Sequence, residues 1–187
     1  MMLQNDKKWK DIKLGTSSDT IGRSGCLLTC YAMIATDCGK AQTPPMMNQC
    51  FINANCYTNG ALLSSDSLEK VFPDIKYIGN ENYTGIKQIQ DLTNGGKFVI
   101  IEVDYDSNPS NGKQTHFILA RWSDGKNIFC DDPLFGDVSL FDRYKAMSII
   151  KLIKYDRNAP QTPQIEDKMT DKEFIKSIIE LVNKFNK

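Results

Sequence analysis

The pattern of hydrophobic and polar positions divides the chain into a helical half and a β-rich half. Residues 1–19 are mostly polar and predict a lead-in arm. In residues 26–37, apolar side chains recur at near-helical spacing, which predicts a mostly buried helix. We expect this helix to begin near Ser24 to Cys26, with Ser24 as its N-cap.

Three shorter helices are expected next. "QTPPMMNQCFINAN" places Thr43 as a cap before two prolines, which suit a first helical turn. "SSDSLEKVF" offers Ser65 or Asp66 as a cap, with Glu69 near the third helical position. "NYTGIKQIQDLTNGG" predicts a helix that ends at its two glycines.

The second half of the chain contains five β-rich runs: KFVIIEVDY, QTHFILARW, KNIFCDDP, DVSLFDR and AMSIIKLIKY. Clusters of glycine, asparagine and aspartate separate the runs, and short turns such as SDGK favour antiparallel hairpins. The expected fold class is therefore α+β, with an N-terminal helical half packed on a C-terminal antiparallel sheet.

One domain, one linker and one terminal helix are expected. The domain covers residues 1–155, and the polar, proline-containing residues 156–169 predict a linker. Residues 170–187 predict a helix with an apolar stripe along one face. That stripe packs either on its own domain or on a protein partner or second copy, and the sequence leaves both alternatives open.

Charge and hydropathy exclude several classes of function. Lysine plus arginine and aspartate plus glutamate number 23 each, so no net charge favours nucleic acid or an anionic membrane. No apolar run approaches the ~20 residues that span a bilayer. The N-terminus, "MMLQNDKKWKD", lacks the apolar core of a signal peptide, so we expect a protein that is cytoplasmic at synthesis.

The six cysteines favour reduced thiols over a disulfide framework, because the chain is not a short secreted domain. Their spacings include no CxxC and match no common zinc finger. No metal and no cofactor are therefore expected. A zinc or redox protein that uses Cys26, Cys30 and His116 is a weaker hypothesis.

Cys26 is the cysteine that lies where a loop turns into a predicted helix. The unpaired backbone N–H groups and the dipole at a helix N-terminus stabilise a thiolate. His116, the only histidine, lies near the start of the predicted strand in "KQTHFILA". A lone histidine is usually structural, but an imidazole is the general base that a cysteine nucleophile needs near neutral pH.

A third group is needed to orient the imidazole. "FCDDPLFG" follows the histidine strand after one short turn, so Asp131 or Asp132 falls near His116 if the two strands pair. Because side chains alternate along a strand, only one of the two can face the histidine. Taken alone, Asp-Asp-Pro is typical of a turn that ends a strand.

Five segments occur in a set order along the chain: LQNDKKWKDIKLG, TIGRSGCLLTCYAMI, QTPPMMNQCF, THFILA and IFCDDPLFG. Together they resemble the papain-like cysteine peptidases, and more closely the bacteriocin-processing, double-glycine-leader peptidases of cysteine peptidase family 39. The resemblance runs from about residue 3 to 153. It implies a papain-like fold and hydrolysis of a peptide or peptidoglycan amide bond.

The resemblance also implies a role for each matching residue. Cys26 would be the nucleophile and His116 the general base and then acid. Asp132 would orient the imidazole, with Asp131 as the runner-up. Gln4 would donate its side-chain amide to the oxyanion, together with the backbone N–H of Cys26.

The chain departs from the family pattern directly after the nucleophile, where relatives often have Gly-Pro and this chain has Leu27-Leu28. Substrate preference, and cleavage after Gly-Gly in particular, is therefore open. The alternative hypothesis is a catalytically inactive module that keeps the fold inside a larger assembly such as a phage tail. A cell-wall substrate without a signal peptide would suit a protein that is associated with a virion or released to the cell wall.

Overall fold

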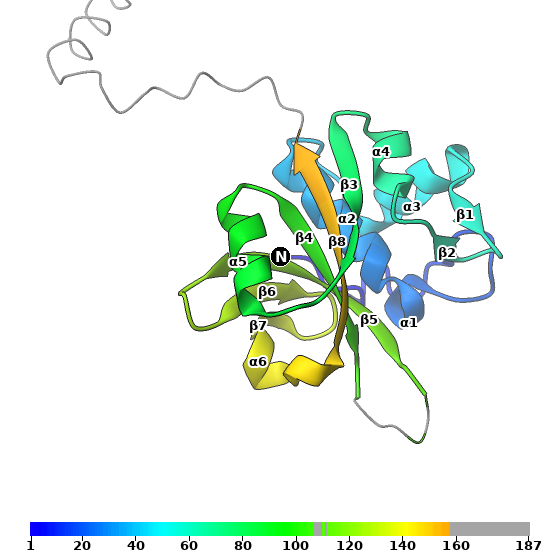
Figure 1. The fold of residues 1–187 in the computed structure, drawn as a ribbon. Coiled ribbons are helices and arrows are strands. Elements are labelled where there is room, and N and C mark those ends of the chain that lie inside the picture. Colours follow the sequence, from blue (N-terminus) through cyan, green and yellow to red (C-terminus); the bar gives the residue numbers. More distant parts are fainter. Residues whose placement is uncertain (107–109, 111, 158–187) are drawn as a thin grey trace, which may run out of the picture. The chain divides into compact units, whose positions relative to one another are not determined.

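The computed structural model describes residues 1–106, 110 and 112–157. Within these residues the chain is a mixed α+β structure, in which a six-stranded sheet carries helices on both faces (Figure 1). The predicted C-terminal helix, 170–187, and residues 158–169 of the predicted linker lie outside the described residues.

The helices are short, and most precede the strands of the large sheet. Their bounds are α1 Ile21–Ser24, α2 Cys26–Asp37, α3 Pro44–Asn53, α4 Ser67–Val71, α5 Ile86–Asn94 and α6 Leu140–Arg143, with a 3₁₀ turn at Ala146–Ser148. None of the helices in the described part of the chain has the length and apolar character that crossing a bilayer requires.

The large sheet has the strand order β3-β8-β4-β5-β6-β7, and every neighbouring pair is antiparallel. Its strands are β3 Ile75–Asn82, β4 Phe98–Asp104, β5 Thr115–Ser123, β6 Ile128–Asp132, β7 Gly136–Ser139 and β8 Ile149–Arg157. A separate hairpin is formed by β1 Tyr57–Thr58 and β2 Leu62–Leu63. The predicted antiparallel sheet and α+β class are confirmed.

Two hydrophobic clusters lie on opposite faces of this sheet because strand side chains alternate. Ile100 and Leu119 pack with α2 and α3 in the first cluster. Their neighbours Ile101 and Ile118 pack with Ile89 of α5 in the second. Figure 1 shows α2 and α3 on one side of the sheet and α5 on the other.

Helix boundaries follow the predicted signals in two places. Thr43 caps α3 and accepts a hydrogen bond from the Met46 backbone N–H, and prolines begin the helix. Gly95 ends α5, and Gly96 has φ of 74°, a conformation that glycine adopts without strain.

Ser24 is not the N-cap of α2, and this prediction is wrong. Ser24 is the last residue of α1, and its hydroxyl donates to Asp19. Gly25 occupies the cap position of α2 without a side-chain hydrogen bond. The physical reason is that Thr20 caps a separate turn, α1, just upstream.

The prediction for α4 is confirmed: Asp66 occupies the cap position and Glu69 is the third helical residue, although the Glu69 carboxylate accepts from Lys76 and from the Tyr77 N–H. Two other boundaries differ from the prediction. The predicted strand 137–143 ends at Ser139, since buried Leu140 begins the turn of α6. Strand β8 continues to Arg157, two residues into the predicted linker.

The β1–β2 hairpin is fixed to the lead-in arm by close backbone contacts. The N–H of Thr16 donates to the carbonyl of Gly60 at 2.9 Å. A Cβ added at Gly15 would lie 2.2 Å from that same carbonyl oxygen, so the approach requires glycine. The side chain of Asn48 joins the arm to α3 by accepting from the Gly15 N–H at 2.9 Å.

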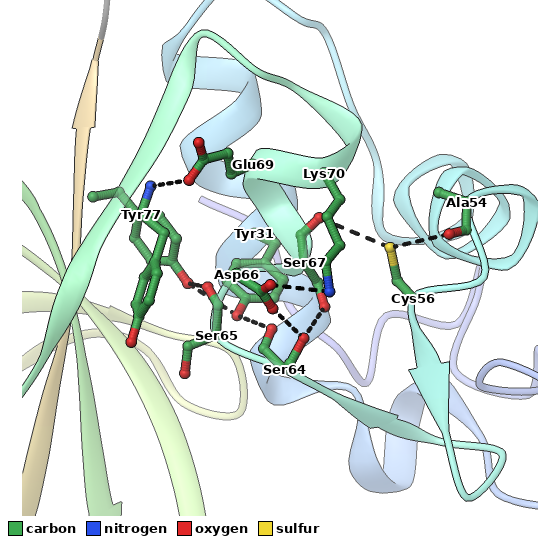
Figure 2. Close-up of polar contacts among 11 residues, drawn as sticks. Tyr31, Ala54, Cys56, Ser64, Ser65, Asp66, Ser67, Glu69, Lys70 and Tyr77 are labelled. Carbon is green, nitrogen blue, oxygen red and sulfur yellow. Dashed lines mark hydrogen bonds and ion pairs between the residues drawn. The ribbon is translucent and has the colours of Figure 1, made fainter.

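The segment that follows β2 is tied to α2 and to the large sheet (Figure 2). The hydroxyl of Tyr31, on α2, donates to the carbonyl of Ser64 at 3.2 Å. The hydroxyl of Tyr155, on β8, donates to the carbonyl of Ser65 at 2.6 Å. These contacts hold the hairpin at a set position beside α2, where it forms one wall of the cleft described next.

Candidate active site

Cys26 is the first residue of α2, as predicted. Its side chain is partly exposed, whereas Cys30, one turn further on, is completely buried. No side chain caps the first turn of α2, so the helix presents its backbone N–H groups at the thiol. The arrangement is one that stabilises negative charge on sulfur.

Gly25 permits the sharp corner between α1 and α2. A Cβ at this position would lie 2.4 Å from the carbonyl oxygen of Ile21. The N–H of Gly25 donates to that oxygen at 2.8 Å, so the two backbone segments are in direct contact. Glycine is therefore required to place Cys26 where it lies.

His116, on β5, is 3% exposed and forms a buried pair with Asp132 on β6. Its Nε2 lies 2.8 Å from Asp132 Oδ1. Burial alone lowers the pKa of His116, but hydrogen bonds with Asp132 and Cys26 and the charges of both groups outweigh it and raise the pKa to about 9. Since Nε2 faces Asp132, Nδ1 is the ring nitrogen left for the Cys26 sulfur.

Asp132 is completely buried, yet its carboxylate is satisfied by several donors. Oδ1 faces His116 and also accepts from the backbone N–H of Leu134 at 2.8 Å and of Phe135 at 3.3 Å. Oδ2 accepts from the hydroxyl of Tyr144 at 2.6 Å. Burial raises the pKa of this carboxyl, but the contacts with His116, Tyr144 and Leu134 hold it below its usual range.

The two candidate aspartates separate as strand alternation requires. Asp132 faces His116, whereas Asp131 accepts from Arg121 Nε at 2.6 Å. Arg121 also pairs with Asp37, the last residue of α2. Asp131 therefore belongs to an ion-pair cluster away from the histidine.

Gln4, in the lead-in arm, lies beside the same cleft and is 1% exposed. Its backbone N–H donates to the carbonyl of Pro133 at 2.8 Å, and its Nε2 donates to the carbonyl of Gly22 at 3.0 Å. One N–H of the amide is thus anchored, and the second is available to a ligand. Gln4 Oε1 is buried without a hydrogen-bond partner in the described structure.

These residues border a cleft of about 680 Å³. The lining includes Gln4, Cys26 and His116, and it includes Leu62 and Leu63 of the β2 strand. Leu62 is 59% exposed although its backbone is held in the anchored hairpin. The cleft is therefore open at the thiol and has a preformed apolar wall.

Aromatic residues that the sequence pattern did not mark surround the His116–Asp132 pair. The ring of Tyr105 meets the ring of His116 edge-on at 6.0 Å and stacks against Phe135 at 6.0 Å. Tyr144 follows the turn of α6, between two of the runs predicted as strands. No local signal marks these residues, because strands distant in sequence bring them together.

None of the six thiols, all within the described residues, is joined in a disulfide. Cys30 packs in the first core cluster, and burial raises its pKa well above the usual value. Cys130 is buried in the second cluster. In the described ranges, no group of three or more His, Cys, Asp or Glu side chains is arranged to hold a metal ion.

Comparison with models of known protein families and with curated proteins finds no match to this chain. Gln4, Cys26 and His116 border one open cleft, and the buried carboxylate of Asp132 holds His116 from behind it. A thiol, an imidazole, a carboxylate and an amide are the kinds of group that acyl transfer uses.

Proposed function

We propose that this protein is a papain-like cysteine peptidase or amidase that hydrolyses a peptide or peptidoglycan amide bond. The observation that carries the proposal is that partly exposed Cys26 borders the same cleft as His116 and helps to raise its pKa, while buried Asp132 holds the His116 ring. The same order of residues, a cysteine opening a helix and then histidine and aspartate on a sheet, supports assignment to the papain-like fold.

The reaction uses the thiolate–imidazolium pair. Cys26 sulfur attacks the carbonyl carbon, and the backbone N–H of Cys26 and the second amide N–H of Gln4 stabilise the oxyanion. His116 gives its proton to the leaving amine as the C–N bond breaks. It then takes a proton from water, which attacks the thioester and releases the acid and the thiol.

The raised pKa of His116 suits this sequence of steps. An imidazole with a pKa of about 9 is protonated at neutral pH, so it supplies the proton that the leaving amine needs. Asp132 stabilises that charge from the opposite side of the ring. A structural histidine buried among apolar groups would instead have its pKa lowered.

The cleft favours an extended chain with apolar side chains. Leu27, Leu62 and Leu63 line the cleft together with Cys26. The family that the sequence resembles often has Gly-Pro where this chain has Leu27-Leu28. Bulky side chains thus fit this wall better than Gly-Gly does. The open cleft, which both Cys26 and His116 border, also favours an enzyme over the alternative of an inactive binding module.

The test is a hydrolysis screen with peptidoglycan fragments and peptides that vary in apolar character. Cys26→Ala should abolish hydrolysis and leave the circular dichroism spectrum and melting temperature nearly unchanged. Cys50→Ala is the matched control, because Cys50 is also partly exposed but lies on α3. Hydrolysis that survives Cys26→Ala would contradict the proposal.

A further inference from the structure

The hydroxyl of Tyr144 reaches the Asp132 carboxylate at the oxygen that does not bind His116. It donates to Asp132 Oδ2 at 2.6 Å, and both side chains are buried, with exposures of 3% and 0%. Oδ1 of the same carboxylate receives the His116 ring and two backbone N–H groups. Among the described residues, Tyr144 is the donor to Oδ2.

Tyr144 is itself held rigidly. Its backbone N–H donates to the carbonyl of Leu140 at 2.7 Å, which closes the turn of α6. Its ring packs in the second core cluster. The guanidinium of Arg143 lies 5.1 Å from the centre of the Tyr144 ring and 4.0 Å from the centre of the Phe135 ring, so it makes cation–π contacts with both rings.

We propose that Tyr144 is a positioning residue, whose hydroxyl fixes the Asp132 carboxylate so that Oδ1 stays directed at His116 and the carboxylate stays ionised. This inference rests on the proposed function. A phenylalanine ring would fill the same place in the core, so what tyrosine adds at this position is its hydroxyl. The hydroxyl here satisfies the carboxylate oxygen that faces away from the histidine, and it thereby fixes the rotation of the whole carboxylate.

The groups around Asp132 determine which side chains can contribute to a pH-dependent change at the site. The charged and titratable groups that contact Asp132 are His116 and Tyr144. Cys30, Cys130, Arg121 and Asp131 share its electrostatic surroundings, and Arg143 and Tyr105 act on Tyr144. Burial raises the pKa of Cys30 and Cys130, so both thiols stay protonated in acid. A change of Cys26 reactivity in the acidic range is therefore attributed to Asp132 and to the His116 that it holds.

The experiment compares Tyr144→Phe with wild type. Removal of the donor raises the pKa of Asp132, so Asp132 is protonated at a higher pH and His116 loses its partner earlier. The rate of Cys26 alkylation by iodoacetamide falls as the pH is lowered, and we call this part of its pH profile the acid limb. The midpoint of the acid limb should move up by about one pH unit, which corresponds to the free energy of one hydrogen bond to a charged group. With a peptide that the enzyme cleaves, kcat should fall about tenfold with KM nearly unchanged.

Nitrogen NMR gives a second readout, because His116 is the only histidine in the sequence. The Nε2–H proton of His116 should exchange with solvent faster in Tyr144→Phe than in wild type. Tyr83→Phe is the matched control: Tyr83 packs against the same cluster as Tyr144, and no hydrogen bond of its hydroxyl is found within the described residues. It should leave the acid limb and the NMR signal unchanged.

The outcomes separate the inference from the proposed function. If wild-type Cys26 is alkylated no faster than Cys50 at pH 6, the proposed function fails. If Cys26 is reactive but Tyr144→Phe keeps the wild-type acid limb and proton exchange, the positioning role is overturned. Should Tyr144→Phe not fold, replacing Tyr144 by 3-fluorotyrosine decides: a more acidic donor should move the acid limb down, and an unmoved limb overturns the role.

Discussion

Helix α2 meets strands β5 and β6 at both of its ends, and each meeting point contains a carboxylate paired with a basic side chain. At the N-terminus of α2, Cys26 borders the same cleft as His116, which is held by Asp132. At the C-terminus, Asp37 contacts Arg121, which also binds Asp131. Neighbouring residues of β6 thus supply the carboxylate to two pairs with different chemistry.

The difference lies in the groups that can change protonation. Arg121 is charged at every physiological pH, so its cluster can fasten α2 to the sheet but cannot move a proton. His116 can gain and lose a proton, and it lies beside a thiol at an open cleft. Burial and ion pairing therefore do not by themselves indicate a functional site. What indicates one is an ion pair in which one side chain can gain and lose a proton and lies beside a cleft that a ligand can enter.

The first test of this difference is to replace each of the two basic side chains, His116 and Arg121, in turn. His116→Gln should lower peptide hydrolysis, and the alkylation rate of Cys26 at pH 6, by about 10² to 10⁴-fold, because the imidazole both stabilises the thiolate and transfers the proton. Steady-state kinetics and mass spectrometry of the alkylated protein measure these changes.

Arg121→Gln is the matched control at the other end of α2. It should lower the free energy of unfolding by about 1 to 3 kcal/mol, since Asp131 loses its partner in a mostly buried place. The alkylation rate of Cys26 should stay within about twofold of wild type. Equal losses of reactivity in the two variants would contradict the division of roles.

Stability against pH provides a second test of the same comparison. The pKa of His116 is raised from 6.5 to about 9 in the folded state, so its stabilising contribution is complete below pH 6.5 and is lost as the pH rises through 9. That loss amounts to about 3 kcal/mol. Urea unfolding of wild type and His116→Gln between pH 6 and 10 measures it.

In that experiment the buried thiols of Cys30 and Cys130 lose their protons at high pH only when the chain unfolds, and they do so in both proteins. The prediction therefore concerns the difference between the two curves. The wild-type advantage over His116→Gln should shrink as the pH rises. A constant difference across this range would show that the histidine is not protonated in the folded protein.

A smaller effect is expected when each aspartate is neutralised. Asp132→Asn keeps an oxygen that accepts from His116 but removes the charge, so the pKa of His116 should fall by about one unit or more. Asp131→Asn should leave the pKa of His116 nearly unchanged, because Asp131 faces Arg121. NMR titration of the single histidine measures both values.

Much of the fold was predictable from local patterns. The helix from Cys26, the Thr43 cap and the antiparallel hairpins follow from spacing and turn residues. Strand β3 escaped prediction because it has many polar residues and is half exposed, and its partner β8 lies more than 60 residues further along the chain. Its pairing depends on contacts that no local window contains.

The candidate site was predictable only in part for the same reason. Residue types and order pointed to Cys26 and His116, but the two adjacent aspartates remained alternatives until the register of β5 and β6 was known. Tyr144 had no local signal at all, since its role depends on the turn of α6 returning toward the end of β6. These contacts join segments that are distant in sequence, so local periodicity cannot predict them.

The most direct test of the central claim is the alkylation of wild-type protein by iodoacetamide at pH 6, with each cysteine quantified by peptide mass spectrometry. Cys26 and Cys50 are both partly exposed, so a difference in rate between them reports activation rather than access. The activated pair predicts that Cys26 reacts at least about tenfold faster than Cys50. Equal, slow labelling of the two thiols would contradict the account.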